Sequence, residues 1–255
     1  MRFEIAAEKD FPPKPAPKGK RPRKSASVFQ DLKRKILTGI LTSDSPITEQ
    51  SLAQDYSCSQ STVREALMLL QEHGLVIRRG YQGTFVTDPS LPEARLMLKL
   101  RLDIEVTGIS EAAKKINSTQ LAELYSIDRQ FEECRARRDV IGCAEFDQML
   151  HQKLFEIADM PVLEPMLLRS TLALQRVMLS APRSEASWGR PNVTPHRAIL
   201  YALETQDLQK ATTALKAHIL SSAVLLAPQF YGTDLDQLQE NYENEPVQIT
   251  ALSGR

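Results

Sequence analysis

The stretch Ser57-Cys58-Ser59-Gln60-Ser61-Thr62-Val63-Arg64-Glu65-Ala66-Leu67 decides how the N-terminal part of this chain folds. Small polar residues stand directly before an apolar series at Val63, Leu67 and Leu70, which is the pattern of a capped helix followed by a buried stripe. With that stripe turned inward, Gln60 and Arg64 fall on other faces of the helix. The free N-terminal end therefore carries hydrogen-bonding groups and a cation, as a recognition surface does.

The segments around this helix predict a winged helix-turn-helix. Residues 47–56 read as a short preceding helix joined to it by a tight turn, which is the geometry that brings a second helix into the major groove of DNA. Leu75–Arg79 and Thr84–Thr87 read as β-strands on either side of Gly80-Tyr81-Gln82-Gly83, so we expect a hairpin, the wing. Apolar residues repeat every four positions across 27–40 and predict an amphipathic first helix.

The segment TVREALMLLQEHGLVIRRGYQGTFV, residues 62–86, resembles the winged-helix signature of the GntR family of bacterial transcription regulators. Several constraints agree in order and spacing, so the match is specific. The resemblance implies a DNA-binding domain at 27–87, and the alternative is a winged helix used for protein contacts.

Three positions of the expected reading surface depart from many relatives. Gln60 and Gln50 stand where relatives carry arginine, and Thr62 stands where proline is common. Arginine reads guanine, whereas glutamine pairs best with adenine N6 and N7, so we expect Gln60 to contact an adenine. For Arg64, a structural ion pair with a nearby acid is as good an interpretation as a DNA contact. The predicted groove residues are Gln50, Ser59, Gln60, Ser61, Thr62 and Arg64, and those on phosphate or minor groove are Arg78, Arg79, Gln82 and Gly83.

Composition bounds the rest of the interpretation. A chain of 255 residues with 42% hydrophobic content suits about two soluble domains, and the formal net charge is zero. No long apolar run or signal-peptide core is evident, so we expect a cytoplasmic protein without a membrane partner. The three cysteines lack metal-type spacing and are expected to be reduced thiols.

Charge is unevenly distributed between the ends of the chain. Residues 1–26 form a basic, proline-rich arm, which is expected to be disordered and either tethers DNA phosphates or is a solvated leader. Residues 231–255 form an acidic tail, with a short fraying helix expected before disorder.

Two prolines within 88–92 predict a linker, beyond which helical periodicity takes over. We therefore predict a mainly α protein, with a second domain at 93–230 that is an all-helical antiparallel bundle. Its expected helices span about 93–115, 118–137, 139–158, 162–180, 194–205 and 207–226.

The histidines of this second domain suggest a metal site. Asp147 precedes His151 by four residues, which puts a carboxylate and an imidazole on one helix face. His196 and His218 would join them from the last two helices, giving a set that suits zinc, nickel or a similar divalent ion. Taken alone, such an Asp-to-His pair is more often simply hydrogen-bonded.

The second domain is also similar to the FCD effector domain of FadR-subfamily GntR regulators. The similarity rests on Leu100–Glu105, Ala112–Lys115, and the Asp147, His151, His196 and His218 positions. It implies a divalent metal, with zinc first and nickel or manganese as alternatives, and a small organic acid that approaches the open positions of the metal. Met160-Pro161 departs from the family, which commonly has an asparagine there.

Two arginines are candidates for binding the effector. Arg101 matches the arginine of the family, and a guanidinium grips a carboxylate in bidentate fashion; the alternative is an ion pair with Glu105 one turn on. Arg176 lies in an apolar helix where a cation needs a reason to face inward, and its alternative is to face solvent.

Together these observations predict a homodimeric transcription repressor, not an enzyme, which binds a pseudo-palindromic double-stranded operator under the control of a small carboxylate. Dimerisation is implied by the family and by symmetric half-sites. In one alternative the metal ion itself is the signal, so that its removal changes operator binding without an organic ligand. In the other, the metal site activates water for hydrolysis, although no general base is evident beside its ligands.

Overall fold

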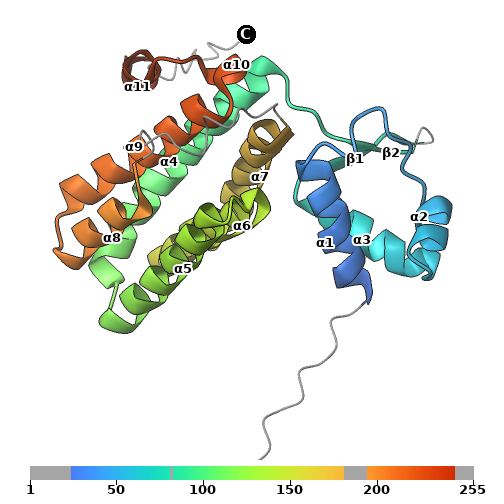
Figure 1. Ribbon diagram of the computed structural model, residues 1–255, viewed down its shortest axis with the longest axis horizontal. Coiled ribbons are helices and arrows are strands. Elements are labelled where there is room, and N and C mark those ends of the chain that lie inside the picture. Colours follow the sequence, from blue (N-terminus) through green and yellow to red (C-terminus); the bar gives the residue numbers. More distant parts are fainter. Residues whose placement is uncertain (1–23, 81–82, 181–193, 245–255) are drawn as a thin grey trace, which may run out of the picture.

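The chain folds into two parts that lie side by side, a head (residues 24–87) and a helical bundle (residues 91–244) (Figure 1). The computed structural model describes residues 24–80, 83–180 and 194–244. The head contains α1 (Lys24–Leu37), α2 (Glu49–Asp55), α3 (Gln60–Glu72), β1 (Val76–Arg78) and β2 (Thr84–Val86). The bundle contains α4 (Leu91–Lys115), α5 (Ser118–Ala136), α6 (Val140–Ala158), α7 (Glu164–Ser180), α8 (His196–Glu204), α9 (Leu208–Leu226), α10 (Pro228–Tyr231) and α11 (Leu235–Asn244).

Helix α3 begins where its sequence predicts. Ser59 is the N-cap, and its side chain accepts a hydrogen bond from the Thr62 backbone N–H at 3.2 Å. This bond satisfies one of the N–H groups that every helix leaves without an intrahelical partner. The turn from α2 passes through Ser57 in the left-handed conformation, at φ +46°. The buried side of α3 is formed by Val63, Ala66, Leu67 and Leu70.

The wing is a two-stranded antiparallel hairpin, and the prediction of a mainly helical protein with a small hairpin is confirmed. Its register pairs Val76 with Val86 and Arg78 with Thr84. A further bridge joins Ile47 to Thr84 and holds the wing against the segment that leads into α2. Helix α3 also contacts β1, so the wing lies against the helix-turn-helix.

Helix α4 runs through the centre of the bundle and contacts α6, α7 and α9 (Figure 1). It begins at Leu91, two residues earlier than predicted, so Pro92 lies in its first turn. Proline is tolerated there because the first N–H groups of a helix have no intrahelical partner. Ser90 and Glu93 form a capping box at this end. Asn117 and Asp207 are the N-caps of α5 and α9.

The described part of the acidic C-terminal segment packs against the bundle through α10 and α11. The α11 side chain Leu238 is only 6% exposed and joins the core of the bundle. Tyr231 donates to the Ala94 carbonyl at 3.2 Å, and Tyr242 donates to the Arg95 carbonyl at 3.0 Å. The described part of this segment thus packs against the start of α4. Its apolar and aromatic side chains explain why a charged stretch is held on the surface.

Within the described ranges, no helix combines the length and the apolar content needed to span a lipid bilayer. The predicted basic arm lies outside the described residues, apart from its last positions, where α1 begins at Lys24 rather than at Ser27.

Candidate functional site

The exposed end of α3 carries the predicted groove residues. Ser59, Gln60, Ser61 and Arg64 are exposed, and Gln50 is exposed on α2. Thr62 is half-buried, and its hydroxyl lies 2.8 Å from that of Ser59. Exposed polar side chains therefore lie at the N-terminal turn of the helix.

Glu49, at the first residue of α2, binds two arginines of this surface. Arg64 contacts it through Nε, at 3.1 Å from each oxygen, and through Nη2 at 2.6 Å, while Arg78 Nη2 lies 3.1 Å from the other oxygen. The bond from Arg64 is the main cause of the lowered pKa of Glu49. The alternative interpretation of Arg64, a structural ion pair, is thus present in the structure. Its side chain nevertheless remains 54% exposed.

The predicted wing residues are distributed around the hairpin. Arg78 and Arg79 are exposed, and the guanidinium of Arg79 lies 5.3 Å from the centre of the Phe85 ring. Gly83 is exposed and has φ +105°, a conformation that side-chain-bearing residues rarely adopt. Gln82 lies outside the described residues.

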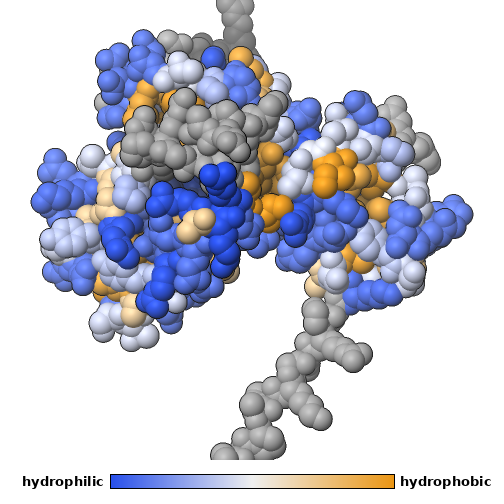
Figure 2. Space-filling model, in the orientation of Figure 1, coloured by the Kyte–Doolittle hydropathy of each residue, from blue (hydrophilic) through white to orange (hydrophobic). Residues whose placement is uncertain are grey.

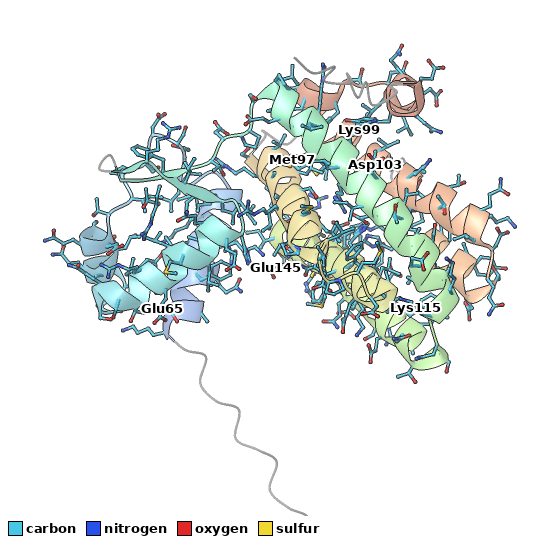
Figure 3. All side chains as sticks on the ribbon, turned by 180° about the vertical axis from the view of Figure 1, so that it is seen from behind. Glu65, Met97, Lys99, Asp103, Lys115 and Glu145 are labelled. Carbon is cyan, nitrogen blue, oxygen red and sulfur yellow. The ribbon has the colours of Figure 1, made fainter. Side chains whose placement is uncertain are left out.

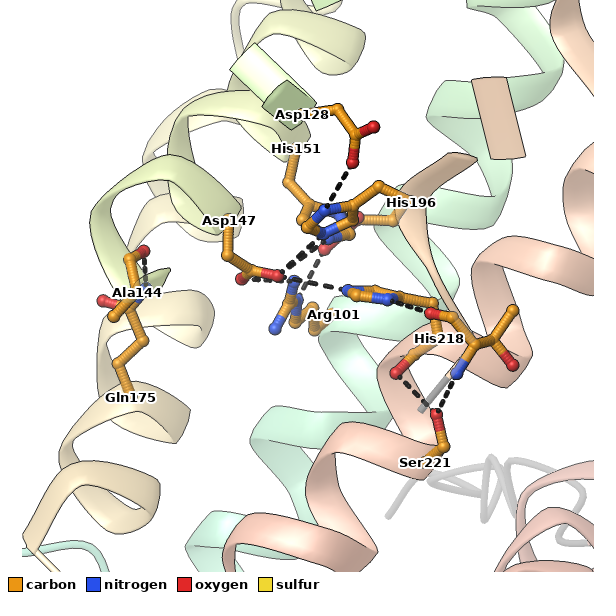
Figure 4. Close-up of polar contacts among 11 residues, drawn as sticks. Arg101, Asp128, Ala144, Asp147, His151, Gln175, His196, His218 and Ser221 are labelled. Carbon is orange, nitrogen blue, oxygen red and sulfur yellow. Dashed lines mark hydrogen bonds and ion pairs between the residues drawn. The ribbon is translucent and has the colours of Figure 1, made fainter. Parts of the chain in front are cut away.

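A second candidate site lies inside the bundle, where three helices bring four side chains together (Figure 4). Asp147 and His151 come from α6, His196 is the first residue of α8, and His218 comes from α9. One donor atom from each lies within 4.8 Å of the others. The Nε2 atoms of His196 and His218 are each 3.1 Å from Asp147 Oδ1, and that of His151 is 3.6 Å away. The three imidazoles thus point the same nitrogen at one carboxylate.

The other ring nitrogen of each histidine faces an oxygen acceptor. Nδ1 of His151 contacts Glu105 on α4, and Nδ1 of His218 donates to the Thr194 carbonyl at 2.7 Å. Nδ1 of His196 lies 3.6 Å from Asp128 Oδ1 on α5 and has no hydrogen-bond partner among the described residues. For His151 and His218, the outer acceptors fix the orientation of the ring and direct Nε2 inward, which is how proteins orient histidine ligands of metals.

The pKa values in this cluster are strongly shifted. Burial would raise the pKa of Asp147, but the neighbouring imidazoles outweigh it and hold that pKa well below its usual value. Burial and the nearby His196 lower the pKa of His218 to about 4. For His151, the effect of burial is outweighed by Glu105, which raises its pKa to about 9.

The donor set fits a divalent cation. His151 Nε2 is buried and has no hydrogen-bond partner among the described residues, although it points toward the other donors. Buried polar atoms are rarely left without a partner, so an unpartnered ring nitrogen among convergent donors is compatible with a metal site. Three imidazoles and one carboxylate are compatible with zinc and with neighbouring transition metals.

Arg101 lies beside this cluster, as an effector-binding residue would have to. It is 3% exposed, and its Nε donates to Glu105 at 2.6 Å, so the alternative ion pair is also present. Its Nη2 is 3.8 Å from Asp147 Oδ2 and has no hydrogen-bond partner in the described structure. One face of the guanidinium is therefore held by Glu105, and one amino group is left facing the cluster.

Arg176, the second effector-binding candidate, is buried rather than turned to solvent. Its Nη1 donates to the Ile36 carbonyl of α1 at 2.7 Å, so the side chain lies at the contact between bundle and head. Its role in effector binding stays a prediction.

Sequence reasoning missed three acceptors, Glu105, Asp128 and Thr194, as partners of the histidines. The position of Glu105 could have been inferred from the sequence, since it lies one turn from Arg101 in the same helix. Those of Asp128 and Thr194 could not, because these residues reach the cluster from segments with no regular spacing to their partners.

Comparison with known proteins identifies both parts. Residues 24–86 match the model of the gntR family of bacterial regulatory proteins, and residues 96–221 match the FCD domain. Over 132 residues, 52% of this chain, it is 28% identical to the HTH-type transcriptional repressor RspR of Escherichia coli K12 and spans 58% of that protein. It is 29% identical to the repressor NagR of Bacillus subtilis over 46% of this chain and 44% of that protein. The chain therefore spans less than two thirds of either relative.

A solved structure supports the fold assignment. The structure of E. coli McbR/YncC superposes with a TM-score of 0.67, covering 82% of this chain and 99% of the other at 18% identity. At this identity the likeness shows a shared fold. The winged head and the FCD bundle are thus established together.

Proposed function

Because the chain belongs to the GntR family of bacterial regulatory proteins and carries an FCD domain behind its DNA-binding domain, we propose that it is a cytoplasmic, homodimeric transcription repressor. Its operator affinity would be controlled by a small carboxylate bound beside a divalent metal ion. The observation that carries this proposal is the convergence of Asp147 and three histidine Nε2 atoms next to an unsatisfied amino group of Arg101.

The DNA-binding part rests on the head. The N-terminal turn of α3 is exposed and polar, and its N-cap and buried stripe hold it rigidly. Two heads related by symmetry would read an inverted repeat whose half-sites lie about one helical turn apart. Gln60 would contact adenine, and Arg78 and Arg79 would contact the backbone. Arg64 would contact DNA while its guanidinium is held in position by the ion pair with Glu49.

The metal would be held by Asp147, His151, His196 and His218. When bound, a divalent cation supplies Lewis-acid positions that an acid can occupy, since four protein donors leave room in a five- or six-coordinate ion. Glu105 keeps Arg101 and His151 in place. The free amino group of Arg101 would then bind a carboxylate oxygen by a charge-assisted hydrogen bond. Both contacts favour a small anion over a neutral ligand.

The ligand would act by favouring one arrangement of the heads. A ligand shifts such an equilibrium only by its difference in affinity for the two states. A coupling of about 1–3 kcal/mol changes operator affinity roughly 5- to 150-fold, which is enough for regulation. We expect binding of the acid to release DNA.

The first test is native mass spectrometry with elemental analysis of protein purified without chelator. We expect a dimer with about one divalent ion per subunit. The ion should be lost in His196→Ala and kept in His73→Gln, the matched control, because His73 lies in the head. Metal-free wild-type protein would overturn the metal part of the proposal.

The DNA part is tested by selecting duplexes from a random-sequence pool with the wild-type protein. We expect an inverted repeat, and failure to enrich any repeat would overturn this part. Operator binding is then measured again after the metal has been removed with a chelator, with no organic acid present. This measurement distinguishes the acid-controlled repressor from the alternative in which the metal ion is itself the signal. That alternative predicts a change in affinity on metal removal alone.

A hydrolytic role is less consistent with the site. The nearby carboxylates Glu105 and Asp128 both face imidazole nitrogens, so neither is free to act as a general base.

A further inference from the structure

One side of α7 faces the head and carries Arg169, Leu172 and Arg176, which are spaced by three and four residues. Residues at this spacing share one face of a helix. Hydrophobic side chains gather on the surface where head and bundle meet (Figure 2). Each of the three residues contacts the head: the two arginines donate hydrogen bonds to backbone carbonyls, and Leu172 packs into the core of the head.

Arg176 caps the C-terminal end of α1. It is 4% exposed and donates from Nη1 to the Ile36 carbonyl at 2.7 Å. The chain leaves α1 through Gly39 at φ +74°, and a Cβ at this position would lie 3.6 Å from the same Nη1. The last carbonyls of a helix lack intrahelical partners and carry the negative end of its dipole. The Ile36 carbonyl also accepts from the Gly39 N–H at 3.1 Å, and the guanidinium adds a second, charged donor at this helix end.

Arg169 repeats this arrangement at the end of the reading helix, two turns away along α7. Its Nε donates to the Glu72 carbonyl at 2.7 Å, at the last residue of α3. The chain leaves α3 through Gly74, also at φ +74°, and the Arg169 stem would be 3.7 Å from a Cβ placed there. The N-terminal turn of α3 thus stays free for DNA, while its C-terminal end is held by the bundle.

Leu172 lies between the two arginines and belongs to the core of the head. It is 0% exposed and packs in the same cluster as Val28, Ile36 and Leu70. The hydrophobic core of the head is therefore completed by a side chain of the bundle. A second contact lies on α6, where Gln148 accepts from Lys33 of α1 at 3.2 Å. Glu145, at this junction in Figure 3, partly offsets the lowering of the Lys33 pKa by burial.

From these contacts we propose that Arg169, Leu172 and Arg176 form a clamp that fixes the orientation of the reading helix on the bundle and so sets the half-site spacing that the dimer accepts. The inference rests on the proposed function, because spacing has meaning only for a DNA-bound dimer. Its reason is geometric. A head held by two directional caps, Arg169 at the end of α3 and Arg176 at the end of α1, cannot rotate to follow a displaced half-site, whereas a head on a flexible linker can.

The test uses a series of DNA duplexes. Each duplex carries two inverted copies of the half-site sequence selected with the wild-type protein. The distance between the two copies increases by one base pair from duplex to duplex, across one helical turn of about 10 base pairs. We expect wild type to bind its best spacing at least about tenfold more tightly than the spacing moved by half a turn. In Arg169→Ala/Arg176→Met this ratio should fall to about threefold or less, with metal content unchanged. The control Arg135→Ala removes an exposed arginine that pairs with Glu132 of its own helix.

A double variant that is folded by circular dichroism and keeps the wild-type spacing preference would overturn the clamp. Should Arg176→Met not fold, Arg169→Ala alone carries the test, because this side chain is exposed. Hydrogen exchange gives a readout without DNA. The amides at 37–41 and 73–75 should exchange faster in the variants, and unchanged rates would contradict the inference. Failure of the wild-type protein to bind any duplex would overturn the proposed function. The clamp would then still be tested by the hydrogen-exchange rates of the amides at 37–41 and 73–75.

Discussion

The Glu105 carboxylate contacts Nδ1 of His151 in the centre of the bundle, while Nε2 of the same ring faces Asp147. Both side chains are almost completely buried, with exposed fractions of 4% and 1%. Despite burial, the pKa of Glu105 falls to about 2 because His151 and Arg101 stabilise its charged form. One carboxylate thus orients a metal-ligand candidate and an anion-binding candidate at once.

Replacing Glu105 with glutamine should therefore weaken metal binding without removing a ligand. Loss of an outer carboxylate typically lowers metal affinity by about 10- to 100-fold. Competition with a chromogenic chelator measures this change. Glu111→Gln is the control, since Glu111 lies on the same helix and pairs with exposed Lys114. Equal affinity in Glu105→Gln and wild type would show that the contact does not orient the ligand.

Glu49→Gln should lower DNA discrimination more than DNA affinity. Glu49 holds Arg64 and Arg78 in defined positions, and a well-placed bidentate contact is worth about 1–3 kcal/mol against a wrong base. Removing the carboxylate frees both guanidinium groups and also removes a negative charge near phosphates. We expect the affinity ratio between selected and scrambled duplexes to fall by about tenfold, with tighter non-specific binding.

Fluorescence anisotropy on the two duplexes measures this ratio. The matched control is Glu65→Gln, which makes the same charge change at an exposed position on α3 (Figure 3). A similar loss of discrimination in both variants would point to general electrostatics rather than to the positioning of Arg64.

Gln60→Arg should change the preferred base from adenine to guanine at one position in each half-site. Glutamine matches N6 and N7 of adenine, whereas arginine matches O6 and N7 of guanine. Selection from a random pool with both proteins checks this prediction. An unchanged consensus would mean that Gln60 does not read a base.

The stability of the head should fall as the pH drops below about 6.5, the ordinary pKa of histidine. Burial, together with the charge of Lys33, lowers the pKa of His73 in the folded protein. Between its folded and unfolded pKa values, the unfolded chain binds a proton that the folded chain does not, so acid favours unfolding. Above this window both states are neutral and the effect disappears.

Thermal unfolding followed between pH 5 and 8 in wild type and His73→Gln isolates this contribution, because the bundle histidines are common to both. The variant should show a weaker decline in melting temperature on acidification. Parallel curves for the two proteins would exclude His73 as the cause.

Gly108→Ala should destabilise the crossing of α4 and α6. An added Cβ would lie 2.6 Å from Cδ2 of Phe155, which is 2% exposed and has little freedom to move. Overpacking of this kind costs about 1–3 kcal/mol. Chemical denaturation measures the loss, and Phe155→Leu should recover part of it in the double variant. Additive effects in this cycle would argue against a direct clash.

The sequence by itself determined the local structure. The N-caps Ser59 and Asn117 stand directly before helices that the pattern predicts, because a cap depends on residues within one turn. Periodicity located α4 to α9 within two residues at each end, since the buried stripe of a helix is a property of consecutive residues. Pro92 was misjudged as a break because proline is also accepted in a first turn.

Tertiary structure alone decided which distant groups meet. Asp147 and His151 share a helix face, but only the packing of α6, α8 and α9 brings His196 and His218 to the same point and turns three Nε2 atoms inward. Likewise, Arg64 pairs with Glu49 and Arg176 reaches Ile36 across elements with no periodic relation. Directional contacts between separate helices depend on helix crossing angles and side-chain rotamers, and neither can be read from the periodicity of the sequence.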